Sequence, residues 1–77
     1  MQWTELYELA GAGSQRWLLL DLCARALSDS TDVVLHAEMT AEVPTLAKLC
    51  AALDAHNVPV PPAVETQVVA SYRLAMT

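Results

Sequence analysis

Hydrophobic side chains occupy most positions from 14 to 28, where the sequence reads SQRWLLLDLCARALS. At about 100° per residue, Asp21, Arg25 and Ser28 fall together on one narrow polar strip of a helix. An ordinary surface helix has the opposite pattern, an apolar stripe beside a broad polar face. We therefore predict a central helix that is enclosed on several sides, by other parts of the chain or by a second copy of it.

The residues before this segment predict a shorter helix over 3–10. Its apolar positions recur at the i, i+3, i+4 and i+7 spacing of one helical face, and they are Trp3, Leu6, Tyr7 and Ala10. Thr4 is expected to cap the N-terminus of this helix. Because only Gly11-Ala12-Gly13 separates it from the central helix, which Ser14 would cap, we expect the two helices to lie side by side as a hairpin.

Two patterns compete in residues 33–40, VVLHAEMT. Their alternation of apolar and polar residues suits a half-buried strand. On helical spacing, however, Leu35 and Met39 are in phase with apolar residues further along the chain. Those residues are Val43, Leu46, Leu49, Cys50 and Leu53. This shared phase favours helix. Pro44 interrupts the backbone, so either the helix is kinked there or Thr40 caps a fresh helix that holds Pro44 in its first turn.

The VPVPP segment at 58–62 predicts an extended connector, because proline cannot continue a helix and fixes its own backbone. Pro62 then suits the first position of a last helix. The C-terminal residues also alternate as a strand would, which leaves open a pairing of 33–39 with 67–75. The predicted fold is an all-α bundle of four to five short helices in a single domain, residues 1–77. The alternative is an α+β fold that contains this two-stranded pairing.

The composition points to a partner. Of the 77 residues, 55% are hydrophobic and only 17% are charged, against about 25% charged residues in a typical globular domain. So little polar surface leaves apolar surface to be covered, and we expect a homodimer or another protein partner. The formal charge of −5 argues against direct binding to nucleic acid or to an anionic membrane, since both need clustered Lys and Arg.

The N-terminal MQWTELYEL carries acids where a signal peptide would carry bases, which favours a cytoplasmic location. Cys23 and Cys50 are then expected to be free thiols in the apolar core. With His36 and His56 they are the soft metal ligands of the chain, but none is paired at the spacing of a structural zinc site. The sequence also lacks a glycine-rich nucleophile turn and a phosphate-binding loop. We therefore expect no metal, no cofactor and no enzyme activity.

Residues 44–53, PTLAKLCAAL, resemble the helix that follows the recognition helix in Cro-like helix-turn-helix repressors. The resemblance implies a DNA-binding regulator. The segment in which the recognition helix would lie, residues 29–42, contains no Lys or Arg. Since a recognition helix needs such residues for phosphates and bases, this regulator is the second alternative to the function predicted next.

Charge placement indicates where a partner protein would bind. Between Arg25 and Lys48 the chain carries acids and no base, and those acids are Asp29, Asp32, Glu38 and Glu42. They form either a solvated face or a docking surface for a basic protein. The candidate apolar contact residues are Trp3, Tyr7, Leu18 and Leu22. The first two could equally cover the core of the hairpin.

The leading hypothesis is a non-enzymatic, acidic protein-binding module of the adaptor or regulator type that associates with itself. The first alternative is an acidic antagonist that binds and blocks a basic, nucleic-acid-binding protein, as phage-encoded inhibitors of host defence can. Both hypotheses rest on the same acidic residues.

Overall fold

The computed structural model describes residues 1–10, 15–42 and 44–76, which form five helices. These are α1 (Trp3–Ala10), α2 (Gln15–Asp29), α3 (Val33–Ala41), α4 (Leu46–Ala55) and α5 (Pro62–Met76). The predicted all-α fold is confirmed. The α+β alternative is wrong, because 33–39 and 67–75 both lie in helices and the described part of the chain contains no strand. The predicted turn at 11–13 and the Ser14 cap lie outside the described residues.

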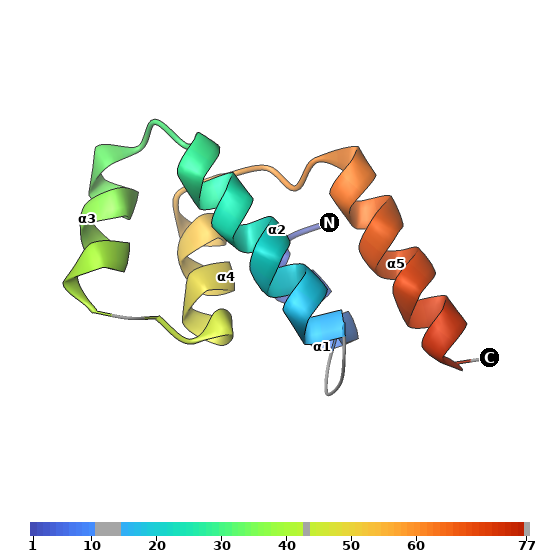
Figure 1. Cartoon of the computed structure of the whole chain (residues 1–77). Helices are drawn as coiled ribbons and strands as arrows, with labels where there is room; N and C mark the ends of the chain where they lie inside the picture. The colour runs from blue at the N-terminus through green and yellow to red at the C-terminus, as the bar shows by residue number, and fades with distance from the viewer. Residues whose placement is uncertain (11–14, 43, 77) are drawn as a thin grey trace.

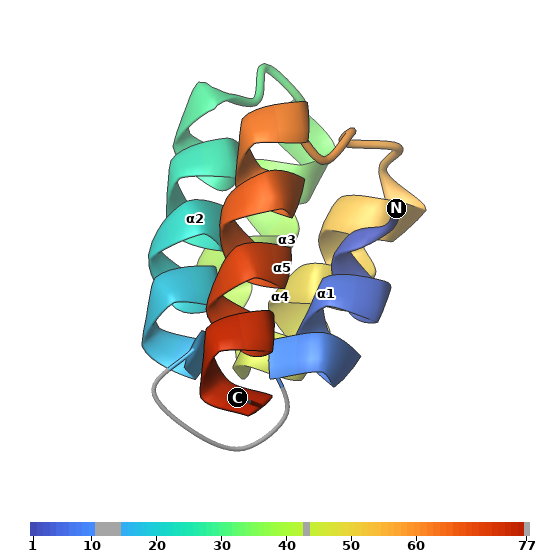
Figure 2. The same ribbon diagram turned by 90° about the vertical axis from the view of Figure 1, so that its right-hand side faces the viewer.

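Three helices form the middle of the molecule, and the other two flank them. α1, α2 and α4 pack against one another. α3 packs on α4 at one side, and α5 packs on α1 and α2 at the other (Figure 1; Figure 2). After α3 the chain thus re-enters the middle layer as α4, and the last helix, α5, packs on the side opposite α3.

The central helix predicted from the sequence, α2, is covered on one face only. The strip predicted to be polar, with Asp21, Arg25 and Ser28, is exposed, and Asp21 pairs with Arg25 at 3.3 Å. The residues buried on the other face are Leu19, Leu22 and Cys23. The exposed face is wider and more apolar than predicted, because Trp17 is 76% exposed and Leu20 is 38% exposed.

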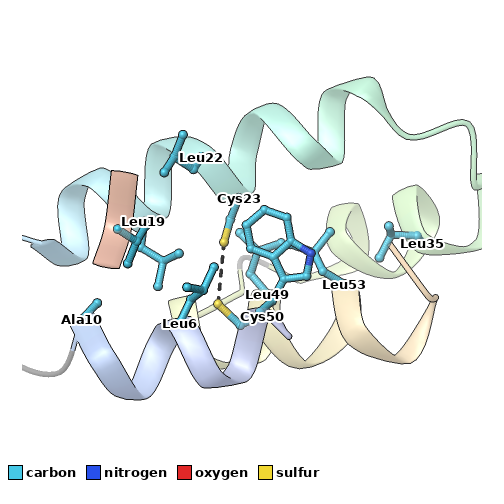
Figure 3. Close-up of a cluster of buried hydrophobic side chains, with 11 residues drawn as sticks. Leu6, Ala10, Leu19, Leu22, Cys23, Leu35, Leu49, Cys50 and Leu53 are labelled. Atoms are coloured by element: carbon cyan, nitrogen blue, oxygen red, sulfur yellow. Dashed lines mark hydrogen bonds between the residues drawn. The ribbon is translucent and has the colours of Figure 1, made fainter. Parts of the chain in front are cut away.

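All five helices contribute to the buried core, and Figure 3 labels core residues from α1, α2, α3 and α4. Its members are Trp3, Leu6 and Ala10 of α1, Leu19, Leu22 and Cys23 of α2, Leu35 of α3, Leu49, Cys50 and Leu53 of α4, and Val68 of α5. Of the predicted apolar stripe, α4 buries Leu49, Cys50 and Leu53 fully and Leu46 in part, and Val43 lies outside the described residues. Of its apolar residues, α3 buries only Leu35 completely and Met39 in part. α3 is therefore attached by little apolar burial, and polar contacts complete its attachment.

The start of α1 is held by a residue of α4. The carboxylate of Asp54 accepts hydrogen bonds from the backbone N–H groups of Trp3 and Thr4 at 2.8 and 3.0 Å. It also accepts one from the Thr4 hydroxyl at 2.8 Å. Thr4 is therefore not the N-cap that the sequence suggested, because it lies inside the helix and its hydroxyl serves as a donor. The indole Nε1–H of Trp3 donates to the carbonyl oxygen of Val58 at 3.0 Å, which ties α1 to the end of α4.

Neither arrangement predicted around Pro44 occurs. α3 ends before this residue and α4 begins after it, with Thr45 as the N-cap. The Thr45 hydroxyl accepts a hydrogen bond from the N–H of Lys48 at 3.3 Å. Thr40, the cap suggested by the sequence, lies within α3. Pro44 thus lies in the connection between two helices, where its missing N–H costs no helical hydrogen bond.

α4 ends in a Schellman motif that directs the chain into the proline connector. The N–H of Val58 donates to the carbonyl oxygen of Leu53 at 2.9 Å, and the N–H of Asn57 donates to the backbone carbonyl oxygen of Asp54 at 3.0 Å. Asn57 has a φ of 58°, in the left-handed region that this motif requires and that asparagine tolerates better than most residues. The helix therefore ends before the connector that the VPVPP segment predicts.

Candidate functional site

An open groove of about 580 Å³ lies beside the α2–α3 turn and the connector between α4 and α5. It is lined by Ala26, Asp29, Ser30, Thr31, Asp32, His56, Asn57, Val58, Pro59 and Pro61. The turn and the end of α2 supply two carboxylates, whereas the connector supplies valine and proline side chains. The groove therefore has an acidic wall facing an apolar one.

Asp32 links the acidic wall to two helices. Its Oδ1 accepts a hydrogen bond from the backbone N–H of Leu35 at 3.0 Å and so caps α3. Its Oδ2 lies 2.9 Å from Nδ1 of His56, which follows α4. The N–H of Leu35 and then His56 hold the pKa of Asp32 below its ordinary value, because both contacts favour the charged carboxylate. Asp32 is thus ionised at neutral pH.

His56 connects two acids of the α3 segment. Its Nδ1 faces Asp32, and its Nε2 lies 3.1 Å from Oε2 of Glu38. Hydrogen bonding to Glu38, and then to Asp32, raises the pKa of His56, since a carboxylate at each ring nitrogen favours the imidazolium. The His56 side chain is 17% exposed. This bridge joins α3 to the end of α4, where apolar burial is small.

The second histidine supports the turn. Nε2 of His36 lies 2.7 Å from the carbonyl oxygen of Ser30, so this nitrogen carries the proton and donates it. The Ser30 hydroxyl oxygen accepts from the N–H of Asp32 at 3.1 Å. The N–H of Ser30 in turn donates to the carbonyl oxygens of Ala26 and Leu27. The acidic wall of the groove is therefore hydrogen-bonded to both helices that the turn joins.

The contacts of this site leave few groups free for a ligand. Each ring nitrogen of His56 faces a carboxylate, so general-base catalysis by this residue would first require one contact to break. Asp29 is exposed, and its side chain makes no hydrogen bond or ion pair with the described part of the chain. Among residues 1–10, 15–42 and 44–76, no group of three or more His, Cys, Asp and Glu side chains could hold a metal ion. A ligand in the groove therefore meets the carboxylate of Asp29, the part of the Asp32 carboxylate that Leu35 and His56 leave uncovered, and the apolar connector.

The structure brings three of the four predicted acids together. Asp29 and Asp32 line the groove, and Glu38 lies beside it through its contact with His56. Glu42 lies at the other end of α3, where its carboxylate pairs with the Lys48 ammonium at 3.4 Å.

Two of the four predicted apolar contact residues belong to the core. Trp3 is fully buried and Leu22 is 8% exposed. A partner cannot reach either of them unless the bundle opens. Both side chains belong to the core cluster, and the indole of Trp3 also donates to Val58.

The other two predicted apolar residues, Tyr7 and Leu18, are half-buried. The guanidinium of Arg16 lies over the ring of Tyr7, 5.9 Å from its centroid. The large apolar side chains that α2 leaves most exposed are Trp17 and Leu20. An apolar contact with another molecule would therefore use these two first.

Sequence reasoning missed the roles of His56 and Asp54. The acid bound to Nδ1 of His56 is 24 positions away, and the Thr4 groups bound to Asp54 are 50 positions away. No local spacing signals contacts of this kind. Asp32 carried a signal, since an aspartate three residues before the first buried position of an apolar run is typical of an N-cap.

The fold and the groove define a small all-α bundle with an acidic site at one end. No family model matches the sequence, and comparison with curated proteins and with solved structures found no similar protein. None of the helices in the described residues is long and apolar enough to cross a membrane. The functional argument therefore rests on the geometry of the groove.

Proposed function

We propose that this chain is a non-enzymatic protein-binding module that receives a basic segment of a partner protein in the acidic groove. The observation that carries the proposal is the lining of this 580 Å³ groove, which combines Asp29 and Asp32 with the apolar connector; its one basic residue, His56, has a carboxylate at each ring nitrogen. A ligand that matches this lining has a positive charge and an apolar stem.

Lysine and arginine side chains have this combination, because a charged head follows an aliphatic stem. Asp29 is the carboxylate best placed to receive such a head, since it is exposed and has no partner in the described residues. Asp32 lies in the same groove, although His56 partly offsets its charge. Arginine fits two neighbouring carboxylates better than lysine does, because its planar guanidinium presents several donors at once.

The walls of the groove are held in place before any partner binds. Proline at 59 and 61 restricts the backbone of the connector. The Schellman motif fixes the start of this connector, and the hydrogen bonds of Ser30 and Asp32 fix the opposite turn. Little conformational entropy is therefore lost in this chain on binding, which favours measurable affinity at a small site.

An NMR titration with a short synthetic peptide, in which Arg alternates with Ala, tests the proposal. The amide shifts of residues 29–32, 56–58 and 60 should move together and saturate. Asp29→Asn should weaken binding about two- to tenfold, as expected for one partly exposed charge contact. Glu8→Gln removes the same charge from an exposed position of α1 and is the matched control.

Equal losses from the two variants would mean that only the overall charge attracts the peptide. Shifts spread over the whole surface, or the absence of saturation, would equally contradict a specific site. Raising the ionic strength should weaken binding without abolishing the shift pattern, because salt screens exposed charges.

A separate observation favours self-association through α2, as a second candidate property. Trp17 is 76% exposed and Leu20 lies on the same face, beside the Asp21–Arg25 pair. In a two-fold arrangement of antiparallel helices, Asp21 of one copy would face Arg25 of the other, so the strip complements itself.

Sedimentation at several concentrations tests this pairing. Trp17→Ser should shift the equilibrium towards monomer, whereas Val33→Ser, at a residue of α3 that is 78% exposed, should not. A wild-type chain that stays monomeric at high micromolar concentration would rule out the association. In that case the exposed tryptophan has no role in pairing copies of this chain.

A further inference from the structure

Two cysteines meet in the core of the bundle. Cys23 of α2 and Cys50 of α4 are both fully buried, and their sulfur atoms are 3.6 Å apart (Figure 3). A hydrogen bond joins the two thiols, and both are free. They belong to helices that pack directly on each other. No local feature of the sequence indicates this contact, since 27 positions separate the two residues.

We propose that Cys23 and Cys50 are an oxidisable pair, which a small hydroperoxide converts into an intramolecular disulfide between α2 and α4. The sulfur atoms already face each other across the helix interface. A disulfide bond needs them at about 2.05 Å, so they must approach by roughly 1.5 Å. Rotation about the side-chain bonds, or a helix shift of about 1–2 Å of the kind that packed helices undergo, is sufficient for this approach.

The two thiols are not equivalent. The hydrogen bond with Cys50, together with burial, raises the pKa of Cys23. The same hydrogen bond lowers the pKa of Cys50, against the effect of its own burial. Of the two, Cys50 is the thiol whose ionisation this hydrogen bond favours, and a thiolate is the form that reacts with peroxide.

The reaction then proceeds in two balanced steps. The Cys50 thiolate attacks one oxygen of the hydroperoxide, which breaks the O–O bond, forms the sulfenic acid and releases hydroxide or alkoxide. The Cys23 sulfur next attacks the Cys50 sulfur, a disulfide forms, and the sulfenic oxygen leaves as water with the proton of the Cys23 thiol. Two thiols are oxidised, and the peroxide is reduced.

Burial determines which oxidant can act and how fast. Because neither thiol is exposed, a bulky disulfide such as oxidised glutathione is excluded from the folded chain. A hydroperoxide of a few atoms enters when the interface opens locally. The oxidation is therefore slow and intramolecular, since the second thiol is already in contact when the first one reacts.

The disulfide would enclose residues 24–49, which include all of α3. Closing this loop restricts the unfolded chain, so the oxidised protein should be harder to denature. We expect the equilibrium constant for folding to rise about a hundredfold, which is a typical effect for a loop of this length. α3 would then be held between two covalently joined helices.

Peptide mapping of the native wild-type chain after treatment with hydrogen peroxide tests the proposal. Cleavage at Lys and Arg places Cys23 in peptide 17–25 and Cys50 in peptide 49–73, with peptide 26–48 between them. The expected product is a monomer that has lost two hydrogen atoms, whose peptides 17–25 and 49–73 are linked. Dithiothreitol should separate the two peptides, and the urea midpoint of the oxidised chain should be higher.

Cys23→Ala and Cys50→Ala are the matched controls, because neither can form the internal bond. The proposal is overturned if peroxide leaves both wild-type thiols free or converts them into sulfinic or sulfonic acids. It is also overturned if the disulfides join two chains, or if linkage occurs only after denaturation. These results depend on the wild-type chain alone, so they stand even if a control variant folds poorly.

Discussion

Replacing Asp54 by alanine tests how far one side chain of α4 determines the position of α1. The carboxylate accepts three hydrogen bonds from Trp3 and Thr4, at distances between 2.8 and 3.0 Å. Two of the donors are backbone N–H groups in the first turn of α1, which have no partner inside the helix. In Asp54→Ala these groups lose their acceptor while the fully buried Trp3 ring still holds the helix in place.

The expected loss follows from these contacts. Removing an ordinary N-cap costs about 0.5–2 kcal/mol, and a hydrogen bond to a charged group contributes about 1.5–3 kcal/mol. Because the site is only partly buried, water replaces part of the lost bonding. We therefore expect the free energy of unfolding to fall by about 2–3 kcal/mol. For a chain of 77 residues, this is a large share of a total free energy of unfolding of about 4–12 kcal/mol.

Urea denaturation followed by far-UV circular dichroism measures the change. With a slope of about 1 kcal/mol per molar urea for a domain of this size, the midpoint should fall by about 2–3 M. Asp54→Asn keeps one acceptor oxygen and should lose about half as much. Asp21→Ala removes an equal charge from an exposed ion pair and should change the free energy of unfolding by no more than about 0.5 kcal/mol.

Equal midpoints for Asp54→Ala and Asp21→Ala would refute this reasoning. Such a result would mean that the packing of Trp3 alone fixes α1, and that water satisfies its first turn without cost. Amide hydrogen exchange adds an independent check, since protection of α1 should fall more than protection of α2.

Three further predictions concern the end of α4. Trp3→Phe loses the hydrogen bond to Val58 and leaves a small cavity, so the free energy of unfolding should fall by about 1–3 kcal/mol in urea denaturation; an unchanged midpoint would contradict this role. Asn57→Ala should lower the free energy of unfolding by about 1 kcal/mol, because alanine is disfavoured at a positive φ. Asn57→Gly should leave it unchanged in the same assay. The third prediction is a stability maximum in mildly acidic solution. Because the pKa of His56 is raised in the folded chain, this residue stabilises the fold. Its contribution to the free energy of unfolding is complete below about pH 6.5 and is lost as the pH rises through the pKa of the folded state. Because the pKa of Asp32 is lowered, its contribution is complete above about pH 4 and is lost as the pH falls. The urea midpoint should therefore be highest between these limits, and in His56→Gln it should fall less from pH 6 to 8; an equal fall would contradict the bridge.

The predicted helices follow from local information. The helix over 3–10 has the bounds that its apolar spacing indicates, and the polar strip of α2 is exposed. A helix repeats every 3.6 residues and its hydrogen bonds are local, so spacing alone carries this signal. At 33–40 the helical spacing of Leu35 and Met39 indicated the right element, but the phase shared with α4 is not its cause, because the backbone is extended at Glu42 and Thr45 between the two helices.

The partners of the polar side chains depend on tertiary structure. Asp54 reaches the start of α1, and His56 reaches Asp32 and Glu38, only because the packed helices bring distant segments together. Which apolar residues remain exposed is decided in the same way. Trp17 and Leu22 are both apolar residues of α2, yet one is exposed and the other buried, because neighbouring helices cover only one face.

The sequence by itself therefore determined the class of the fold, the existence of its helices and the acidic character of one segment. The tertiary structure decided the groove, the bridge at His56 and the contact between Cys23 and Cys50. The physical reason is the range of the interactions. Helical periodicity depends on neighbours three and four residues away, whereas a groove or a thiol pair depends on how helices far apart in sequence are packed.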